Sequence, residues 1–364
     1  MHLRSLLLSL VVAVCATSPA AAAAPVRHVF VIVLENEDAS TTFSAGSAAP
    51  YLAQTLTAQG AFVPGYYGIG HFSLDNYIAM LSGQAPTMVT QADCPQFDDV
   101  EPGLPSADGQ ILGQGCVYPA SVQTVAGQLR AKDLEWKGYM EDMGAVASRD
   151  GGTSCAHPAI GAFDTTQQAT PADQYATRHN PFVYFHSIID DGAGCAARDV
   201  PLTGLAADLA SARTTPNLSF ITPDLCNDGH DATCADGGPG GLPAADAFLQ
   251  KWVPQITASR AYRRDGLLVI AFDEAGSDSS ACCNEQSGPN TLAAGGPSGG
   301  PGGGRTGAVL LSPFIRPGTV STQQYNHYSF LRSVEDAFGL AHLGYAAAPG
   351  LRAFGTDIFT ANKP

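Results

Sequence analysis

The stretch VFVIVLENED, residues 29–38, joins six apolar residues directly to Glu35, Asn36, Glu37 and Asp38. An uninterrupted apolar run rich in β-branched residues predicts a strand that is covered on both faces, as in a parallel sheet. Parallel α/β sheets bind their ligands beyond the carboxyl ends of the strands. The polar residues that follow this strand are therefore candidates for a site, although solvated loop residues would give the same pattern.

A second stretch, DGLLVIAFDEAGSD at residues 265–278, repeats the pattern, because an apolar run ends in Asp273 and Glu274. Either acidic end alone is also typical of a helix N-cap or a polar turn. If the two strands are parallel neighbours, however, their acidic ends meet at one edge of the sheet. Clustered carboxylates repel one another unless a cation neutralises them. The two stretches together therefore suggest a metal site.

The first 24 residues have the features of a secretory signal peptide. Arg4 gives a positive start, SLLLSLVVAVCA an apolar centre, and residues 20–24 a run of five alanines. The apolar centre is too short to span a bilayer. We expect cleavage near Ala23 or Ala24, export to the periplasm or the medium, and a single domain over residues 25–364.

Eight of the nine cysteines lie beyond this segment, and an even number in an exported chain suggests disulfides. Spacing favours the pairs Cys94–Cys116, Cys155–Cys195 and Cys226–Cys234, whereas the partners of the adjacent Cys282 and Cys283 stay open. Three of the cysteines, Cys94, Cys116 and Cys155, fall in the loop-rich segments 90–118 and 144–180, which we expect to be disulfide-stapled insertions over the rim of the sheet.

The overall charge excludes some classes of partner. The formal net charge is −15, with 18 Lys and Arg against 33 Asp and Glu. An acidic protein with few basic residues makes a poor nucleic-acid binder and has no polybasic membrane anchor. The sequence also contains no repeats and no second long apolar span, so we expect no stable membrane anchor.

Apolar runs alternate with helical patterns along the chain, which favours a mostly parallel central sheet with helices on both faces, a three-layer α/β/α fold. The runs expected to be strands are residues 28–34, 181–188, 218–223, 267–272 and 307–315. The segments expected to be helices are residues 74–83, 120–136 and 244–259, with a bend or break at Pro254. The glycine-rich segment 287–307 lacks the P-loop pattern.

The stretch GHFSLDNYIAMLSG, residues 70–83, places Ser73 where a helix should begin and Asn76 on the same first turn. Serine is a favoured N-cap, and this purely structural role is the plain interpretation. A helix N-terminus is also an anion site, and a hydroxyl there beside a cation can attack phosphorus. The two acidic strand ends favour this second interpretation.

Two histidines stand in loops that suit a phosphate site. His230 lies in PDLCNDGHD, residues 223–231, after a predicted strand, and His327 precedes the amphipathic stretch that ends at residue 340. Such a histidine can protonate a leaving group or bind a charged ester, although an Asx-rich turn or a helix start explains either one structurally. His186 is interpreted as a packed residue outside the site.

Together these stretches resemble the bacterial and fungal phosphoesterases of the acid phosphatase and phospholipase C type, which belong to the alkaline phosphatase superfamily. The resemblance runs from about residue 26 to the C-terminus. It is carried by an ordered set of motifs: HVFVIVLEN, HFSLDNYIAMLSG, WKGYMEDM, RHNPFVYFHSI, TPDLCNDGHD, AADAFLQKWVP, GLLVIAFDEA and YNHYSFLRSVEDAFGL. It implies an alkaline phosphatase-like three-layer fold.

The resemblance also implies roles for particular residues. Ser73 would be the nucleophile and would touch the metal. The other metal ligands would be Glu35, Asn36, Asp273 and Glu274, although many relatives have aspartate where this chain has Glu274.

The same resemblance implies that Asn76, His230 and His327 contact the phosphate, with His230 and Asn76 serving catalysis directly. Relatives often have S-x-P-N where this chain has Ser73-Leu74-Asp75-Asn76, which leaves the spacing of Ser73 and Asn76 intact.

A ligand set made of oxygen atoms favours Ca²⁺, Mg²⁺ or Mn²⁺, with Zn²⁺ as the alternative. The leading hypothesis is a secreted, metal-dependent phosphoesterase that hydrolyses small phosphate esters or phospholipids through a phosphoserine intermediate. Because the chain lacks the long extension of many phospholipase C relatives, an acid phosphatase is favoured over a phospholipase C or other phosphodiesterase.

Other classes are less favoured. A sulfatase would need a C/S-x-P-x-R motif around its nucleophile, and Ser73 has neither the Pro nor the Arg. A conventional serine hydrolase would need a G-x-S-x-G elbow, which no serine has. A non-catalytic secreted calcium-binding protein could keep the acidic rim without using Ser73.

Overall fold

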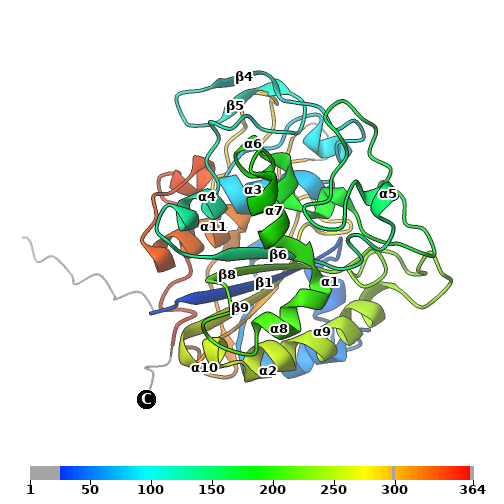
Figure 1. Ribbon diagram of the computed structural model, residues 1–364. Coiled ribbons are helices and arrows are strands. Elements are labelled where there is room, and N and C mark those ends of the chain that lie inside the picture. Colours follow the sequence, from blue (N-terminus) through cyan, green and yellow to red (C-terminus); the bar gives the residue numbers. More distant parts are fainter. Residues whose placement is uncertain (1–24, 297–299, 361–364) are drawn as a thin grey trace, which may run out of the picture.

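The computed structural model describes residues 25–296 and 300–360 (Figure 1). The expected signal peptide lies outside the described residues. An eight-stranded sheet forms the centre of the fold. Its strands are, in order across the sheet, β11 (Thr319–Val320), β2 (Ala61–Val63), β10 (Ala308–Leu311), β9 (Gly266–Phe272), β1 (His28–Leu34), β8 (Leu218–Thr222), β6 (Trp136–Met140) and β7 (Asp199–Pro201).

The sheet is mostly parallel, as expected. Of its strands, only β10 runs antiparallel to its neighbours, β9 and β2. Strand β1 lies at the centre and pairs in parallel with β9 on one side and β8 on the other. Two short pairs lie outside the sheet, β3 (Tyr66–Tyr67) with β12 (Tyr325–Asn326) and β4 (Glu101–Pro105) with β5 (Ile111–Gln114).

Helices cover both faces of the sheet, which confirms the three-layer α/β/α fold (Figure 1). One layer contains α3 (Ser73–Ser82), α4 (Val125–Arg130), α6 (His186–Ile189), α7 (Gly192–Arg198) and α11 (His327–Phe338). The other contains α2 (Thr57–Gln59), α8 (Leu205–Asp208), α9 (Gly241–Ala258) and α10 (Arg260–Asp265). The remaining short helices are α1 (Ala39–Thr42) and α5 (Ala147–Asp150).

The alternation of side chains along β1 explains why the sheet needs two helical layers. The valines at positions 29, 31 and 33 pack into one apolar cluster with α3 and α11. Phe30, Ile32 and Leu34 point the other way and pack into a second cluster with α9. All seven residues of β1 are buried. None of the helices in the described ranges has the length and hydrophobicity that a bilayer crossing requires.

Four disulfides tie the loops to this core. The three predicted pairs, Cys94–Cys116, Cys155–Cys195 and Cys226–Cys234, are confirmed. The remaining two cysteines are bonded to each other as the adjacent pair Cys282–Cys283. The first pair closes the segment 90–118, which carries the β4–β5 hairpin at the top of Figure 1.

One predicted strand is wrong. Residues 181–188 form a 3₁₀ turn, Pro181–Tyr184, followed by α6. Proline cannot donate a hydrogen bond to a strand ladder, so a run that begins with Pro181 is a poor sheet strand. The aromatic residues that suggested a buried strand are indeed buried, but in the core between the loops and the sheet rather than in the sheet itself.

Two predicted helices differ in extent from the observed ones. The segment 120–136 forms only α4, because Thr124 caps the helix by accepting a hydrogen bond from Gly127 N (3.1 Å) and Asp133 adopts a left-handed φ of 57° before β6 begins. Helix α9 continues past Pro254 to Ala258, so the proline does not break it. The packing of α9 side chains against the sheet stabilises the helix by more than the missing backbone hydrogen bond at Pro254 costs.

Candidate functional site

The two acidic strand ends meet at the centre of the sheet. Strands β1 and β9 are parallel neighbours in a register that pairs Leu34 with Phe272. Glu35 and Asp273, the next residue of each strand, therefore lie side by side, and both are buried. Asp273 Oδ1 accepts hydrogen bonds from Asn36 N (3.1 Å) and Glu274 N (2.6 Å), so its carboxylate fixes the turns that follow both strands.

Ser73 joins this pair from the start of α3. Its Oγ donates a hydrogen bond to Glu35 Oε2 over 2.8 Å, and its side chain is buried. The preceding residue, Phe72, has φ 73° and ψ 153°, a strained backbone for a bulky residue. Glu274 stabilises this conformation because its Oε1 accepts a hydrogen bond from Phe72 N (3.0 Å). The sequence-predicted nucleophile thus lies directly at the acidic rim.

Two further residues hold Glu35 and were missed by sequence reasoning. Tyr77 donates its hydroxyl hydrogen to Glu35 Oε1, and His179 Nε2 lies 3.4 Å from Glu35 Oε2. The rings of Tyr77 and His179 stack with centroids 5.4 Å apart. Tyr77 could have been found, because it lies four residues after Ser73 on the same face of a helix. The motif around His179 gave no local signal for a contact with a residue so distant in sequence.

The sequence-predicted Asn76 does not face the cavity. Its Oδ1 accepts hydrogen bonds from Ile69 N (2.7 Å) and Gly70 N (3.3 Å), and its Nδ2 donates to Gly70 O and Phe72 O, both at 2.9 Å. The side chain is fully buried. Asn76 therefore braces the turn that presents Ser73.

The two predicted histidines occupy different positions. His230 lines the cavity beside Ser73, and its side chain is 53% exposed. His327 is fully buried behind the rim, where its ring contacts Asp273 O (2.5 Å) and Tyr66 Oη (3.1 Å). Burial lowers the pKa of His327 to about 4, so its ring is neutral at ordinary pH. The structure brings His230 to the cavity and keeps His327 as a support beneath it.

A cavity of about 530 Å³ opens in front of Ser73. It lies at the carboxyl ends of the central strands, where a parallel α/β sheet binds its ligands. The residues that line it are Asn36, His71, Phe72, Ser73, Asp93, Arg178, His230, Glu274, Ala275 and Gly276.

Several oxygen atoms at this rim are buried without a hydrogen-bond partner among the described residues: Asn36 Oδ1, Asp273 Oδ2 and Asp228 Oδ2. Burying a polar atom without a partner is costly, so such a cluster points to a bound group. Burial, together with the Asp273 and Asp228 carboxylates, raises the pKa of Glu35 well above its usual value. Buried carboxylate and amide oxygens in this number fit a hard divalent cation.

Glu274 also faces this region, but both of its oxygens have protein partners. Oε2 contacts His71 Nδ1, and Oε1 accepts from Phe72 N. The hydrogen bond with Glu274 raises the pKa of His71 above its usual value, which favours a charged pair. His71, absent from the sequence prediction, thus orients Glu274.

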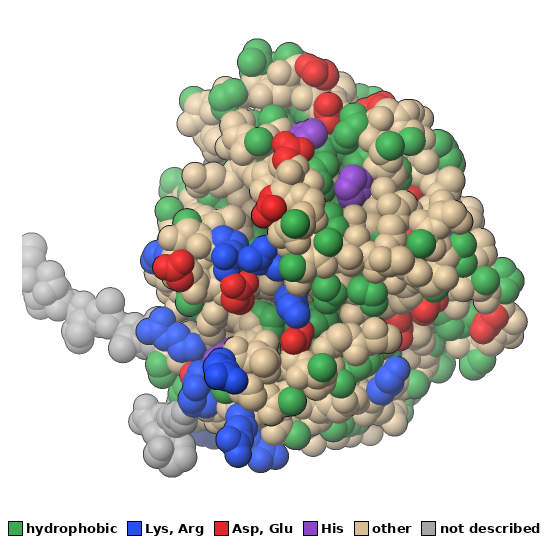
Figure 2. All heavy atoms as spheres, viewed as in Figure 1, with side chains coloured by type: hydrophobic (Ala, Val, Ile, Leu, Met, Phe, Trp, Pro, Cys, Tyr) green, Lys and Arg blue, Asp and Glu red, His purple; other side chains and the backbone are tan. Residues whose placement is uncertain are grey.

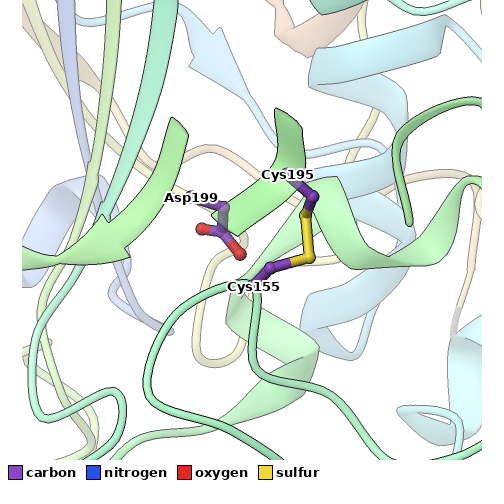
Figure 3. Close-up of side chains that lie close together, drawn as sticks. All are labelled: Cys155, Cys195 and Asp199. Atoms are coloured by element: carbon purple, nitrogen blue, oxygen red, sulfur yellow. A yellow bond between two sulfur atoms is a disulfide. The ribbon is translucent and has the colours of Figure 1, made fainter. Parts of the chain in front are cut away.

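A second cluster of ligand-type residues lies elsewhere and is no metal centre. Cys155 and Cys195 lie beside the carboxylate of Asp199, but the two sulfur atoms are joined in a disulfide (Figure 3). A disulfide offers no thiolate ligand. Asp199 Oδ2 instead accepts a hydrogen bond from Asn180 Nδ2 over 2.8 Å, which indicates a structural role.

Two curated proteins are similar to this chain over most of its length. An acid phosphatase of Aspergillus fumigatus is 25% identical over 293 residues, which cover 79% of this chain and 51% of that protein. A phosphatidylinositol-3-phosphatase of Mycobacterium tuberculosis is 26% identical over 356 residues, which cover 98% of this chain and 90% of that protein. This chain thus spans about half the length of the fungal relative.

A solved structure is similar in fold, and a family model matches most of the chain. The crystal structure of Ps i-CgsB is 11% identical with a TM-score of 0.51, covers 93% of this chain and 77% of that chain, and shows a likeness of fold. The model of the Phosphoesterase family matches residues 41–341. This match confirms the family expected from the motifs: the chain belongs to the Phosphoesterase family.

Proposed function

We propose that this protein is an exported, metal-dependent phosphoesterase that acts through a phosphoserine on Ser73. The hydrogen bond from Ser73 Oγ to Glu35 Oε2 carries the proposal, because it places a hydroxyl at a rim of buried, unpartnered oxygen atoms. Four disulfides and the expected signal peptide support export, since disulfides persist in oxidising compartments.

The metal would be held by Glu35, Asn36 and Asp273, with Ser73 beside it and Glu274 available from the cavity wall. When bound, such an ion polarises the phosphoryl oxygens and neutralises charge that develops on them. The all-oxygen ligand set supports Ca²⁺, Mg²⁺ or Mn²⁺, with Zn²⁺ as the alternative.

The proposed reaction consists of two successive displacements at phosphorus. Ser73 Oγ forms a bond to phosphorus while the bond from phosphorus to the leaving oxygen breaks, and the hydroxyl proton passes to Glu35, its hydrogen-bond acceptor. His230, at the open side of the cavity, donates a proton to the leaving oxygen. In the second displacement water attacks phosphorus while His230, now deprotonated, takes one proton from that water. The bond from phosphorus to Ser73 Oγ breaks, and the proton held by Glu35 returns to Oγ.

Phosphomonoesters are the proposed substrates. Two similar proteins of different length carry phosphatase names, an acid phosphatase and a phosphatidylinositol-3-phosphatase. We propose small phosphate esters, a class that includes the headgroup phosphate of a lipid because its chemistry is the same.

The test removes the metal and then the nucleophile. The purified protein is treated with a chelator and refilled with Ca²⁺, Mg²⁺, Mn²⁺ or Zn²⁺ separately, and hydrolysis of p-nitrophenyl phosphate and of bis(p-nitrophenyl) phosphate is followed. We expect chelation to abolish hydrolysis, one ion to restore it, and the monoester to be the better substrate.

Ser73→Ala should then be inactive with every ion. Ser82→Ala is the matched control, because Ser82 is a buried serine in the same helix whose Oγ donates to Ile78 O (2.9 Å). If Ser73→Ala hydrolyses the monoester as fast as the wild type does, the proposed nucleophile is wrong.

A further inference from the structure

The proposed substrate is an anion, but the cavity that should receive it is bordered by acids. Asp93 and Glu274 line it, and Glu35 and Asp273 lie behind Ser73. A divalent ion offsets part of this charge. Among the described residues that line the cavity, Arg178 is the sole lysine or arginine. Its guanidinium is therefore the permanent positive charge in the cavity wall, in addition to the His71 ring, which is paired with Glu274.

Basic side chains are concentrated elsewhere on the molecule. On the face shown in Figure 2, Lys and Arg gather toward the lower left, over α10, which contains Arg260, Arg263 and Arg264. Helix α10 leads into the amino end of β9, whereas the cavity lies at the carboxyl ends of the strands. This basic region cannot reach the phosphoryl group, so the local arginine matters more.

The position of Arg178 relative to Ser73 is fixed by one carboxylate. Asp93 Oδ1 accepts hydrogen bonds from Ser73 N and Leu74 N, both over 3.1 Å. Asp93 Oδ2 lies 3.7 Å from Arg178 Nε. The same side chain thus contacts the backbone of the nucleophile and the guanidinium, which places both on one wall of the cavity.

The guanidinium is also held from behind. Arg178 Nη1 donates a hydrogen bond to Gln167 O (3.3 Å), and Gln167 Nε2 donates to Asp93 O (2.9 Å). The side chain of Arg178 is 13% exposed. A guanidinium carries five N–H donors in a planar fork. The contacts with Gln167 O and Asp93 Oδ2 engage two of its nitrogens, Nη1 and Nε. The fork geometry matches two oxygens of a phosphoryl group.

We propose that Arg178 binds the phosphoryl group of the ester and the inorganic phosphate released from it, and that it makes the site prefer monoesters. This inference rests on the proposed function. A monoester presents three unesterified oxygens and up to two negative charges, whereas a diester presents two oxygens and one charge. Once other groups have bound some of these oxygens, the monoester still leaves more oxygen atoms and more negative charge for Arg178 to bind. Arg178 therefore strengthens binding of the monoester more than binding of the diester.

Binding of inorganic phosphate tests the inference without turnover. The holoprotein is titrated with inorganic phosphate by calorimetry, in buffer that contains Mn²⁺, Mg²⁺ or Ca²⁺. Replacing a charge-assisted pair by a neutral side chain should weaken binding at least about tenfold in Arg178→Gln. Arg178→Lys keeps a point charge without the fork and should lie between wild type and Arg178→Gln.

The matched control is Arg305→Gln. Arg305 is exposed, lies at the end of the glycine-rich segment and does not line the cavity. Its replacement removes the same charge from the protein and should leave phosphate affinity unchanged. If Arg178→Gln does not fold, Arg178→Lys carries the test, because loss of the fork alone should weaken phosphate binding measurably.

Kinetics give a readout that a merely structural role would not move. Arg178→Gln should raise KM for p-nitrophenyl phosphate more than it lowers kcat, and it should lower kcat/KM for the monoester more than for bis(p-nitrophenyl) phosphate. Equal phosphate affinity in Arg178→Gln and wild type, or an equal loss on both esters, would overturn the inference.

The outcome is separable from that of the proposed function. If wild type binds phosphate through Arg178 but hydrolyses neither ester, the anion site stands and the phosphoesterase proposal fails. If wild type hydrolyses the monoester while Arg178→Gln retains full phosphate affinity, the enzyme stands and the role of Arg178 fails.

Discussion

The hydroxyl of Tyr77 offers a sharp test of how the metal-binding rim is built. It donates a hydrogen bond to Glu35 Oε1, while the Tyr77 ring stacks on His179. Tyr77→Phe keeps the ring, the stacking and the apolar packing, and removes a single donor. Glu35 Oε1 is then left in a fully buried environment with one partner fewer.

The direction of the effect follows from the charge of Glu35. The hydrogen bond from Tyr77 lowers the pKa of Glu35, against the larger upward effect of burial. Without it, the ionised ligand is harder to maintain. A hydrogen bond to a charged group contributes about 1.5–3 kcal/mol. Loss of such an orienting partner should weaken metal binding by about 10- to 100-fold.

The assay is a calorimetric titration of the chelator-treated protein with Mn²⁺, combined with the metal dependence of p-nitrophenyl phosphate hydrolysis. Tyr139→Phe is the matched control, because the buried Tyr139 also donates its hydroxyl hydrogen to a carboxylate, Asp208 Oδ2 (2.8 Å), away from the site. Both variants should lose stability to a similar extent, but only Tyr77→Phe should lose metal affinity. Equal Mn²⁺ affinities in the two variants would refute the reasoning.

Two further predictions concern stability. Glu335 is fully buried, and burial raises its pKa to about 8, so the folded protein holds a proton that the unfolded chain releases near pH 4.5. The stabilising contribution of protonated Glu335 is complete below pH 4.5 and is lost as pH rises toward 8, by up to about 1.4 kcal/mol per pH unit. Glu335→Gln should therefore flatten the dependence of Tm on pH between 5 and 8. An unchanged profile would contradict this prediction. Cys94 and Cys116 are 22 residues apart, so the double variant Cys94→Ser/Cys116→Ser should lose about 3 kcal/mol of unfolding free energy in urea titrations. Because Asp93 adjoins Cys94, the double variant should also have a higher KM than the wild type. A double variant with wild-type stability and wild-type KM would show that this disulfide supports neither the fold nor the site.

The central geometry could be predicted from sequence because it depends on short, local patterns. Two apolar runs ending in acids gave β1 and β9, and their parallel pairing put Glu35 beside Asp273 as expected. Ser73 could be placed near a helix start because a serine before an apolar helical pattern marks one, although Phe72 is the N-cap and Ser73 is the first residue of the fully buried helix α3. Each of these signals lies within about ten residues.

The features that sequence reasoning predicted wrongly or missed either have an ambiguous local pattern or depend on contacts between residues far apart in the chain. The run PFVYFHSI is as apolar as a buried strand, but sequence alone does not say that its burial comes from loop packing. Strand β6 was missed because the helical pattern before it extended to Trp136. The orientation of Asn76 depends on the turn at residues 69–72, and the contact of His179 with Glu35 spans 144 residues (179 − 35), so neither has a local signature.

The stereochemical course at phosphorus tests the proposed reaction most directly. A phosphomonoester made chiral at phosphorus with oxygen isotopes and sulfur is hydrolysed by the metal-loaded enzyme, and the configuration of the product is determined. Two successive in-line displacements, first by Ser73 and then by water, predict net retention. Net inversion would mean that water attacks the ester directly, and would contradict a covalent intermediate on Ser73.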